Sequence, residues 1–205
     1  MSAAPQSSDP GEALRALAEQ LRAEPTVIAP HVIEPGAEPA LGLLAAACPR
    51  AAGTPGEYAL VVESVREGYL LHYGGPRVLR VRDPDLALLA GDYLYARGIE
   101  RLAALGDTEA VRELGDLISL SAECHAEGRL EVVPPLWLAA TIAVGAGADA
   151  GHEAAKEEAR ALAPEAADRL WETARDRAAG LGLGGALDRA AEGIDFAAPR
   201  VDPSG

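Results

Sequence analysis

Apolar residues recur along the chain at helical spacing, in segments bounded by recognisable start and stop signals. The first segment predicts a short helix that ends near Ala23, with Asp9 as its N-cap and Pro10 at the first helical position. Residues 24–39 hold four prolines and one glycine, which is typical of an extended crossing loop. A short apolar helix over residues 40–48 follows. The pattern thus begins with two short helices joined by a long loop.

Three longer helices are predicted in the middle of the chain. Residues 54–57 (Thr-Pro-Gly-Glu) match a capping box and open a helix that ends at residues 74–76 (Gly-Gly-Pro). Asp83 marks the start of the second helix, and Asp107 caps a third that runs to about Glu127. The second of these helices is apolar on two sides. We therefore expect two of its faces to be buried, one by the core and one by a partner chain.

The last part of the chain alternates between uncharged and charged helical segments. An uncharged helix is predicted over residues 136–146, and a charged, alanine-rich helical region follows at 151–179, divided by Pro164. The glycines of residues 180–185 form a joint, after which Ala186 opens a last short helix. These glycines do not predict a phosphate loop, because they follow a helix and not a strand, and no lysine-serine pair succeeds them.

Composition agrees with the helical pattern. Aromatic residues make up only 4% of the chain, while alanine and leucine, both strong helix formers, supply most of its 49% hydrophobic content. No segment shows the apolar-polar alternation of a strand, and no internal repeat occurs. The sequence therefore predicts an all-α fold, a single-domain bundle of about eight or nine helices over residues 10–196. We expect flexible tails at residues 1–9 and 197–205.

Charge narrows the classes of function. The chain has 32 acidic and 18 basic residues and a net charge of −14. A field of this sign repels phosphate backbones and anionic lipids, so we expect no nucleic-acid binding and no peripheral membrane binding. The longest uncharged run, residues 132–148, contains two prolines and much alanine and glycine, so it predicts a buried core helix and not a membrane span. The N-terminal residues lack a basic secretory signal, which favours a cytoplasmic protein.

Few residues offer site chemistry. Cys48 and Cys124 are too few for a disulfide framework or a cysteine-only zinc site, so we expect buried free thiols. In residues 123–127 (Glu-Cys-His-Ala-Glu), helical geometry points the cysteine and the histidine away from the two glutamates, so no metal site is expected. Asp92 lies inside an apolar helix, where it could cap a neighbouring helix, pair with Arg97 or face a cavity. No cofactor is expected.

One segment resembles a known family. Residues 88–97 read Leu-Leu-Ala-Gly-Asp-Tyr-Leu-Tyr-Ala-Arg, and the corresponding helix of the trans-isoprenyl (polyprenyl) diphosphate synthases reads much like VLAGDYLLARAFELLA. Weaker similarities occur in the family's order at residues 39–48, 63–72 and 137–145. The resemblance covers about residues 35–150 and implies an isoprenoid-synthase-like but truncated bundle.

The residues that carry this family's chemistry are missing. Its members hold magnesium with two aspartate-rich motifs and bind diphosphate through basic residues. Residues 73–77 stand in place of the first aspartate motif and contain no carboxylate, and residues 36–38 replace a basic loop with Gly-Ala-Glu. Val133 and Pro134 stand at the family's lysine-threonine pair, and the second aspartate motif is absent. The resemblance therefore implies a relative that is not an enzyme and holds no metal.

Chains of this family that lack the motifs act as small non-catalytic subunits. The non-catalytic component of heptaprenyl diphosphate synthase is the most similar in organisation. The resemblance thus implies a regulatory or scaffolding subunit that forms a heterodimer or heterotetramer with a catalytic polyprenyl diphosphate synthase and influences its stability or product length. The family's dimer interface maps to residues 84–127. Its candidate contact residues here are Leu89, Asp92, Tyr93, Tyr95, Ile99 and Leu102.

Other functions are compatible with the same residues. The bundle could have kept its central cavity and lost the diphosphate chemistry, which would make the chain a binding protein for a prenyl or other lipid tail. The candidate cavity-lining residues are Tyr69, His72, Ala139, Ala140 and Ala143. An active enzyme with relocated residues and a scaffold in an unrelated complex are the further alternatives.

Overall fold

The computed structural model describes residues 9–197, and within them the regular structure is helical. The α-helices are α1 (Ala13–Ala23), α2 (Ala40–Ala46), α3 (Pro55–Tyr73), α4 (Pro84–Ala104), α5 (Thr108–Ala126), α6 (Val133–Ala146), α7 (Ala150–Arg160), α8 (Ala166–Gly180) and α9 (Gly184–Gly193). Short 3-10 turns are η1 (Pro10–Glu12), η2 (Ala29–His31), η3 (Pro49–Gly53) and η4 (Leu130–Val132). The predicted all-α bundle is confirmed for this range. The predicted tails lie outside the described residues, apart from Asp9 and Ala197.

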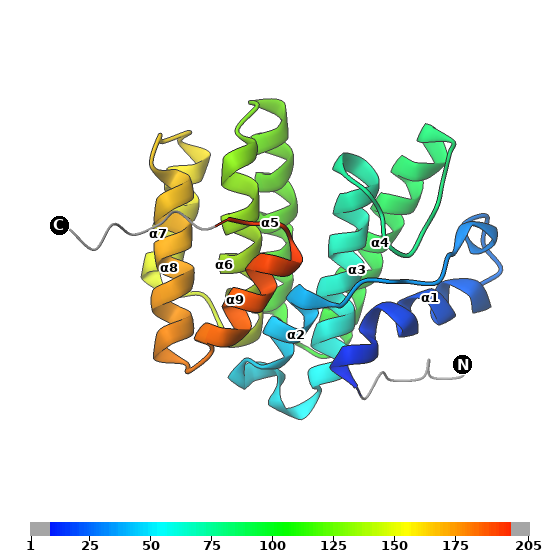
Figure 1. Ribbon diagram of the computed structural model, residues 1–205, viewed down its shortest axis with the longest axis horizontal. Helices are drawn as coiled ribbons and strands as arrows, with labels where there is room; N and C mark the ends of the chain where they lie inside the picture. Colours follow the sequence, from blue (N-terminus) through cyan, green and yellow to red (C-terminus); the bar gives the residue numbers. More distant parts are fainter. Residues whose placement is uncertain (1–8, 198–205) are drawn as a thin grey trace.

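Helix α6 lies at the centre of the larger core. Twelve of its fourteen residues are buried, and α2, α5, α8 and α9 pack around it. A helix enclosed on all sides needs no polar face, which explains its lack of charge. The prediction of a core helix in the uncharged run is therefore confirmed. In Figure 1, α7 and α8 flank α5 and α6 on one side, and the α3–α4 pair lies on the other.

A second, smaller core joins α1 to the α3–α4 pair. It combines leucines of α1 with Leu60, Leu94 and the loop residues Val78 and Leu79. The crossing loop between α1 and α2 runs beside this loop, and the backbone N–H groups of Ile33 and Arg80 donate to Val78 and His31. The predicted extended loop is thus held against the core by a short backbone pairing.

The starts of α9 and α3 differ from the predicted signals: α9 begins at Gly184, inside the predicted glycine joint and before Ala186, and α3 lacks its predicted cap. The side chains of Asp83 and Asp107 accept backbone N–H groups in the first turns of α4 and α5, as expected of N-caps. Thr54 precedes α3, but its side chain forms no cap hydrogen bond. The predicted start of the helix is thus correct, but the predicted capping box is wrong, because the Thr54 side chain does not cap α3. Glu57, its expected partner, is buried and forms an ion pair with Arg101 of α4, with a shortest distance of 2.8 Å.

Helices α3 and α4 approach each other closely through glycines. A Cβ added at Gly68 would lie 2.9 Å from the backbone oxygen of Gly91, and one added at Gly91 would lie 2.4 Å from His72 Nε2. Both distances are shorter than real Cβ contacts. The glycine in the Gly-Asp-Tyr segment thus allows the helices to pack, which explains its presence on physical grounds alone.

Gly68→Ala is therefore expected to lower the free energy of unfolding by about 1–3 kcal/mol, because the opposing backbone oxygen cannot move aside without separating the helices. Gly115→Ala on α5 is the matched control. A Cβ there meets nothing within 4 Å, so the better helix propensity of alanine should raise stability by up to about 1 kcal/mol. Urea unfolding of both variants measures the difference, and a stabilised Gly68→Ala protein would contradict the close packing.

Candidate functional site

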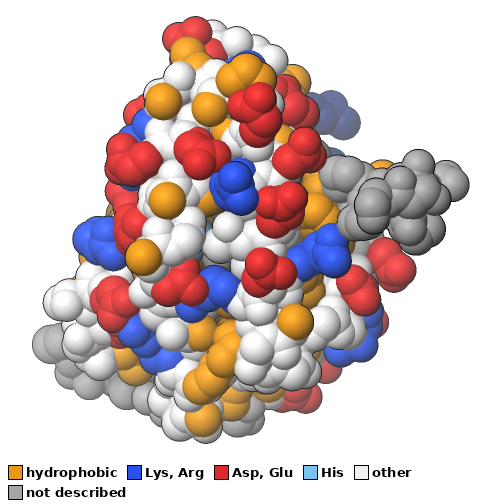
Figure 2. Space-filling model, turned by 90° about the vertical axis from the view of Figure 1, so that its left-hand side faces the viewer, with side chains coloured by type: hydrophobic (Ala, Val, Ile, Leu, Met, Phe, Trp, Pro, Cys, Tyr) orange, Lys and Arg blue, Asp and Glu red, His pale blue; other side chains and the backbone are white. Residues whose placement is uncertain are grey.

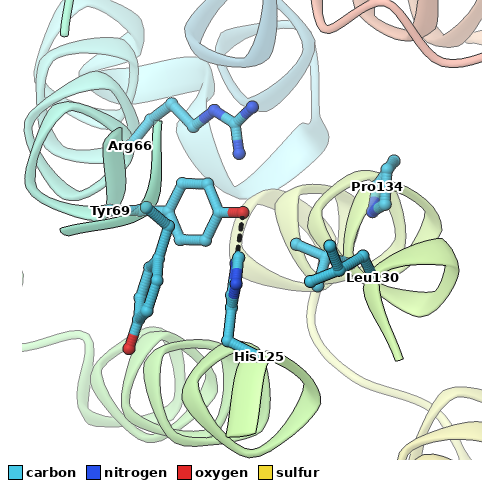
Figure 3. A pocket seen from close by; sticks show the side chains of 7 residues that line it. Arg66, Tyr69, His125, Leu130 and Pro134 are labelled. Atoms are coloured by element: carbon cyan, nitrogen blue, oxygen red, sulfur yellow. Dashed lines mark hydrogen bonds between the residues drawn. The ribbon is translucent and has the colours of Figure 1, made fainter. Parts of the chain in front are cut away.

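A pocket of about 230 Å³ opens where α3 and α5 end and α6 begins (Figure 3). Tyr73 and Leu130 are the most exposed residues of its lining and mark the mouth, while Tyr69 is only 8% exposed. The full lining is Arg66, Tyr69, Tyr73, His125, Leu130, Val133 and Pro134. These residues come from three helices and one 3-10 turn, so the bundle itself fixes their relative positions.

Arg66 places a positive charge beside the aromatic walls. Its guanidinium carbon lies 4.7 Å from the centroid of the Tyr69 ring and 4.8 Å from that of Trp137. Among residues 9–197, the side chain forms no hydrogen bond and no ion pair within 4.0 Å. Burial lowers the pKa of Arg66 to about 10, which leaves it protonated at neutral pH. The pocket thus contains a cation that packs on aromatic rings and has no direct carboxylate partner, although the charge of Glu63 favours its protonated form.

Tyr69, Tyr73 and His125 form the polar and aromatic side of the pocket. The Tyr69 hydroxyl and His125 Nε2 are hydrogen-bonded at 2.9 Å, and the Tyr73 and His125 rings stack with centroids 3.9 Å apart. Burial raises the pKa of Tyr69 and lowers the pKa of His125, so both side chains are held in their neutral forms. The lining contains no carboxylate and no nucleophilic serine or cysteine. Its chemistry suits binding.

The predicted interface residues divide by exposure. Leu89 is 56% exposed and Asp92 is also exposed, whereas Tyr93, Tyr95 and Ile99 are partly buried. Leu102 is fully buried in the larger core, where a partner chain cannot contact it. Leu102 is therefore corrected as a candidate contact residue, because its side of α4 is the one that the core of the same chain buries.

Asp92 and Arg97 do not form the pair considered as one alternative. Asp92 Oδ1 lies 3.2 Å from His72 Nε2, at the end of α3. Arg97 instead forms an ion pair with Glu24 and donates a hydrogen bond to Gln20. Glu24 also accepts a hydrogen bond from the Tyr93 hydroxyl. Helix α4 thus uses Tyr93 and Arg97 to hold the start of the crossing loop.

The candidate cavity-lining residues are not brought together. Tyr69 lines the pocket, whereas the His72 ring stacks on Tyr95 with centroids 5.3 Å apart. The three alanines of α6 are at most 1% exposed and pack inside the larger core or beside it; they are Ala139, Ala140 and Ala143. Sequence reasoning missed the other pocket residues. The available signal was Arg66 and Tyr73, which share a helix face with Tyr69 at spacings of three and four.

The residues weighed as metal ligands serve other contacts. Within the described range, no three histidine, cysteine, aspartate or glutamate side chains are grouped so as to hold a metal ion. His125 contacts Tyr69, and Cys124 is buried. Cys48 is also a buried free thiol, whose pKa burial raises to about 11, so the prediction of two buried free thiols is confirmed.

No protein-family model, no curated protein and no solved structure matches this chain. None of the helices within residues 9–197 has the length and apolar character needed to cross a bilayer.

Proposed function

We propose that this chain is a non-catalytic, regulatory or scaffolding subunit that binds a catalytic polyprenyl diphosphate synthase in the cytoplasm and influences its stability or product length. The observation that carries the proposal is the pair of leucines on the outer side of α4. Leu88 and Leu89 are 49% and 56% exposed, although they are adjacent in a helix whose opposite side is buried. Together they offer an apolar contact that a partner chain could cover.

The outer face of α7 and α8 differs from this surface. In Figure 2, which views that side of the molecule, acidic and basic side chains are interspersed and apolar ones are mostly scattered among them. Ion pairs such as that of Arg169 with Glu172 occur there, between largely exposed groups. Such a surface is typical of contact with solvent, so α4 is the better choice for binding a partner.

The pocket lining offers a second argument for this proposal. The resemblance places the lost aspartate motif from Tyr73 onward and the lost lysine-threonine pair at Val133 and Pro134. These positions are 60 residues apart in sequence, yet all three residues line the same pocket. A tyrosine, a valine and a proline there cannot hold magnesium or bind a diphosphate. A bundle that lost this chemistry while keeping an outer apolar surface is suited to a role as a binding subunit.

Leu89→Glu is expected to weaken partner binding at least tenfold, because it places a charge in an apolar contact while leaving the fold intact at a half-exposed position. Leu181→Glu is the matched control, since Leu181 is a 38% exposed leucine at the end of α8. The tagged chain would be purified from its native cells, with partners identified by mass spectrometry. A chain carrying two aspartate-rich motifs should be recovered stoichiometrically with the wild type and Leu181→Glu.

Recovery of the protein alone would refute the proposal, as would a partner without the aspartate motifs. Equal recovery with Leu89→Glu would show that the partner binds elsewhere than α4. Circular dichroism of both variants verifies that they are folded, so that a loss of partner cannot be attributed to unfolding.

A further inference from the structure

We propose that the pocket lined by Arg66 is a binding site for a small organic monoanion, a carboxylate attached to a flat apolar body. The site shares no residue with the Leu88–Leu89 surface, so its occupancy does not depend on the proposed partner. The pocket presents one cation at one side and aromatic or aliphatic side chains elsewhere (Figure 3). A ligand that matches both parts needs a single negative charge and an apolar remainder.

Other partly buried arginines of this chain are paired with carboxylates. Arg77 forms ion pairs with Glu63 and Glu67, and Arg101 forms one with Glu57. Arg66 forms no such ion pair within the described residues: Glu63 favours its charge, but that carboxylate is paired with Arg77. Partial burial of an unpaired charge is unfavourable, and the contacts with Tyr69 and Trp137 offset only part of that cost. A bound carboxylate would complete the site through a bidentate pair with the guanidinium.

The shape of the pocket limits the ligand. A volume of about 230 Å³ corresponds to roughly eight water molecules, which suits a ligand of about a dozen non-hydrogen atoms and is too small to enclose a long prenyl chain. Leu130 and Pro134 lie across the pocket from Tyr69 (Figure 3), and Val133 adds a further apolar side chain to the lining. Pro134 and Pro135 have no N–H groups, so the start of α6 offers few donors for a phosphate. A diphosphate carries several charges and would meet a single guanidinium, so a carboxylate is the better match.

The experiment is calorimetric titration of the full chain with 2-naphthoate, a flat carboxylate of suitable size. We expect saturable binding at one site with a dissociation constant of about 0.1–1 mM. The neutral analogue 2-naphthalenemethanol should bind at least tenfold more weakly, because it cannot pair with Arg66. Inorganic phosphate and diphosphate are titrated in parallel, because a phosphate-binding site would bind them more tightly than 2-naphthoate.

Four variants locate the binding site. Arg66→Gln should weaken 2-naphthoate binding at least tenfold, and Arg66→Lys should weaken it less, because the charge is kept and the planar group lost. Leu130→Trp should block the mouth, and since Leu130 is 54% exposed, this change leaves the core untouched. Arg175→Gln removes one charge from an exposed position on α8 and should leave binding unchanged.

Loss of binding in Arg66→Gln and Leu130→Trp, with retention in Arg175→Gln, would support the site. The absence of saturable 2-naphthoate binding would overturn it. So would binding that is unchanged in Leu130→Trp, which remains informative even if Arg66→Gln fails to fold. Tighter binding of phosphate or diphosphate than of 2-naphthoate would overturn the proposed ligand class.

Discussion

Glu67→Ala is expected to lower the free energy of unfolding by about 3–5 kcal/mol, a large share of the stability of a typical domain. The Glu67 carboxylate is fully buried and accepts the backbone N–H groups of Arg77, Val78 and Leu79 at 2.6–3.2 Å. It also forms an ion pair with the Arg77 side chain. Alanine would remove the acceptor of all three N–H groups. Water cannot replace it at Val78 and Leu79, because these two residues are buried.

Glu100→Ala is the control, since Glu100 is an exposed glutamate on α4 and should change stability by at most about 0.5 kcal/mol. Urea unfolding followed by circular dichroism measures both. A loss in Glu67→Ala no larger than in Glu100→Ala would mean that the loop after α3 does not depend on this carboxylate. Hydrogen exchange of the Val78 and Leu79 amides provides a second test, and their protection should fall in Glu67→Ala.

The role of Glu67 could not be predicted from the sequence. Charged residues are seldom fully buried, so a glutamate on a long helix is normally assigned to its solvent face. Glu63 and Glu67 are both buried on α3, and their partner Arg77 lies in the loop after the helix. Helical periodicity relates residues three or four apart and contains no information about a loop that folds back on the helix.

Helix boundaries were predicted more accurately, for local reasons. Asp83 and Asp107 cap the helices that follow them, and each aspartate accepts a backbone N–H from a residue at most three positions further along the chain. The glycines after α8 end the helix as expected, with Gly182 at a φ of 72°. Signals of this kind act within one turn of the chain, so they can be recognised without knowledge of the tertiary structure.

The pocket illustrates the opposite case. Arg66 and Tyr69 come from α3, His125 from α5, and Val133 from α6. Their grouping depends on how three helix ends meet, which the hydrophobic pattern does not specify. The prediction of a central cavity included Tyr69 but missed Arg66, His125 and Val133, and it added three alanines of α6 that pack in or beside the core. The space in the structure instead lies where α3 and α5 end and α6 begins.

Lys156→Met is the second change expected to have a large effect: it should lower the free energy of unfolding by about 3–5 kcal/mol at pH 7. The Lys156 side chain is fully buried between α5 and α7, and its Nζ lies 2.7 Å from both Glu113 Oε2 and Asp116 Oδ2. Glu113 is itself buried and also contacts His152 Nε2 at 2.6 Å. Methionine fills a similar volume but leaves carboxylates without the ammonium group that compensates them.

The loss should depend on pH in a direction set by this cluster. Burial raises the pKa of Asp116, but its hydrogen bonds and ion pairs with Lys156 and Arg160 outweigh this, so the pKa lies below the ordinary 3.8. The stability contributed by Asp116 is therefore fully present above pH 3.8 and is lost as the pH falls through the lowered value. Burial likewise opposes the charge on Lys156, yet Asp116 and Glu113 raise the pKa of Lys156 above 10.5. The stability that Lys156 contributes is therefore fully present up to pH 10.5 and is lost only as the pH rises through the raised pKa.

Lys156→Met and the wild type should thus differ most between about pH 5 and pH 10, and the difference should shrink as the pH is lowered toward 3. Urea unfolding at intervals of one pH unit measures this. Arg175→Gln is the matched control, because Arg175 is exposed on α8 and forms no ion pair among the described residues. A difference between wild type and Lys156→Met that stays constant from pH 7 to pH 3 would indicate that the loss comes from packing and not from charge. The acid limb of the stability curve therefore separates an electrostatic role of this buried lysine from a purely volumetric one.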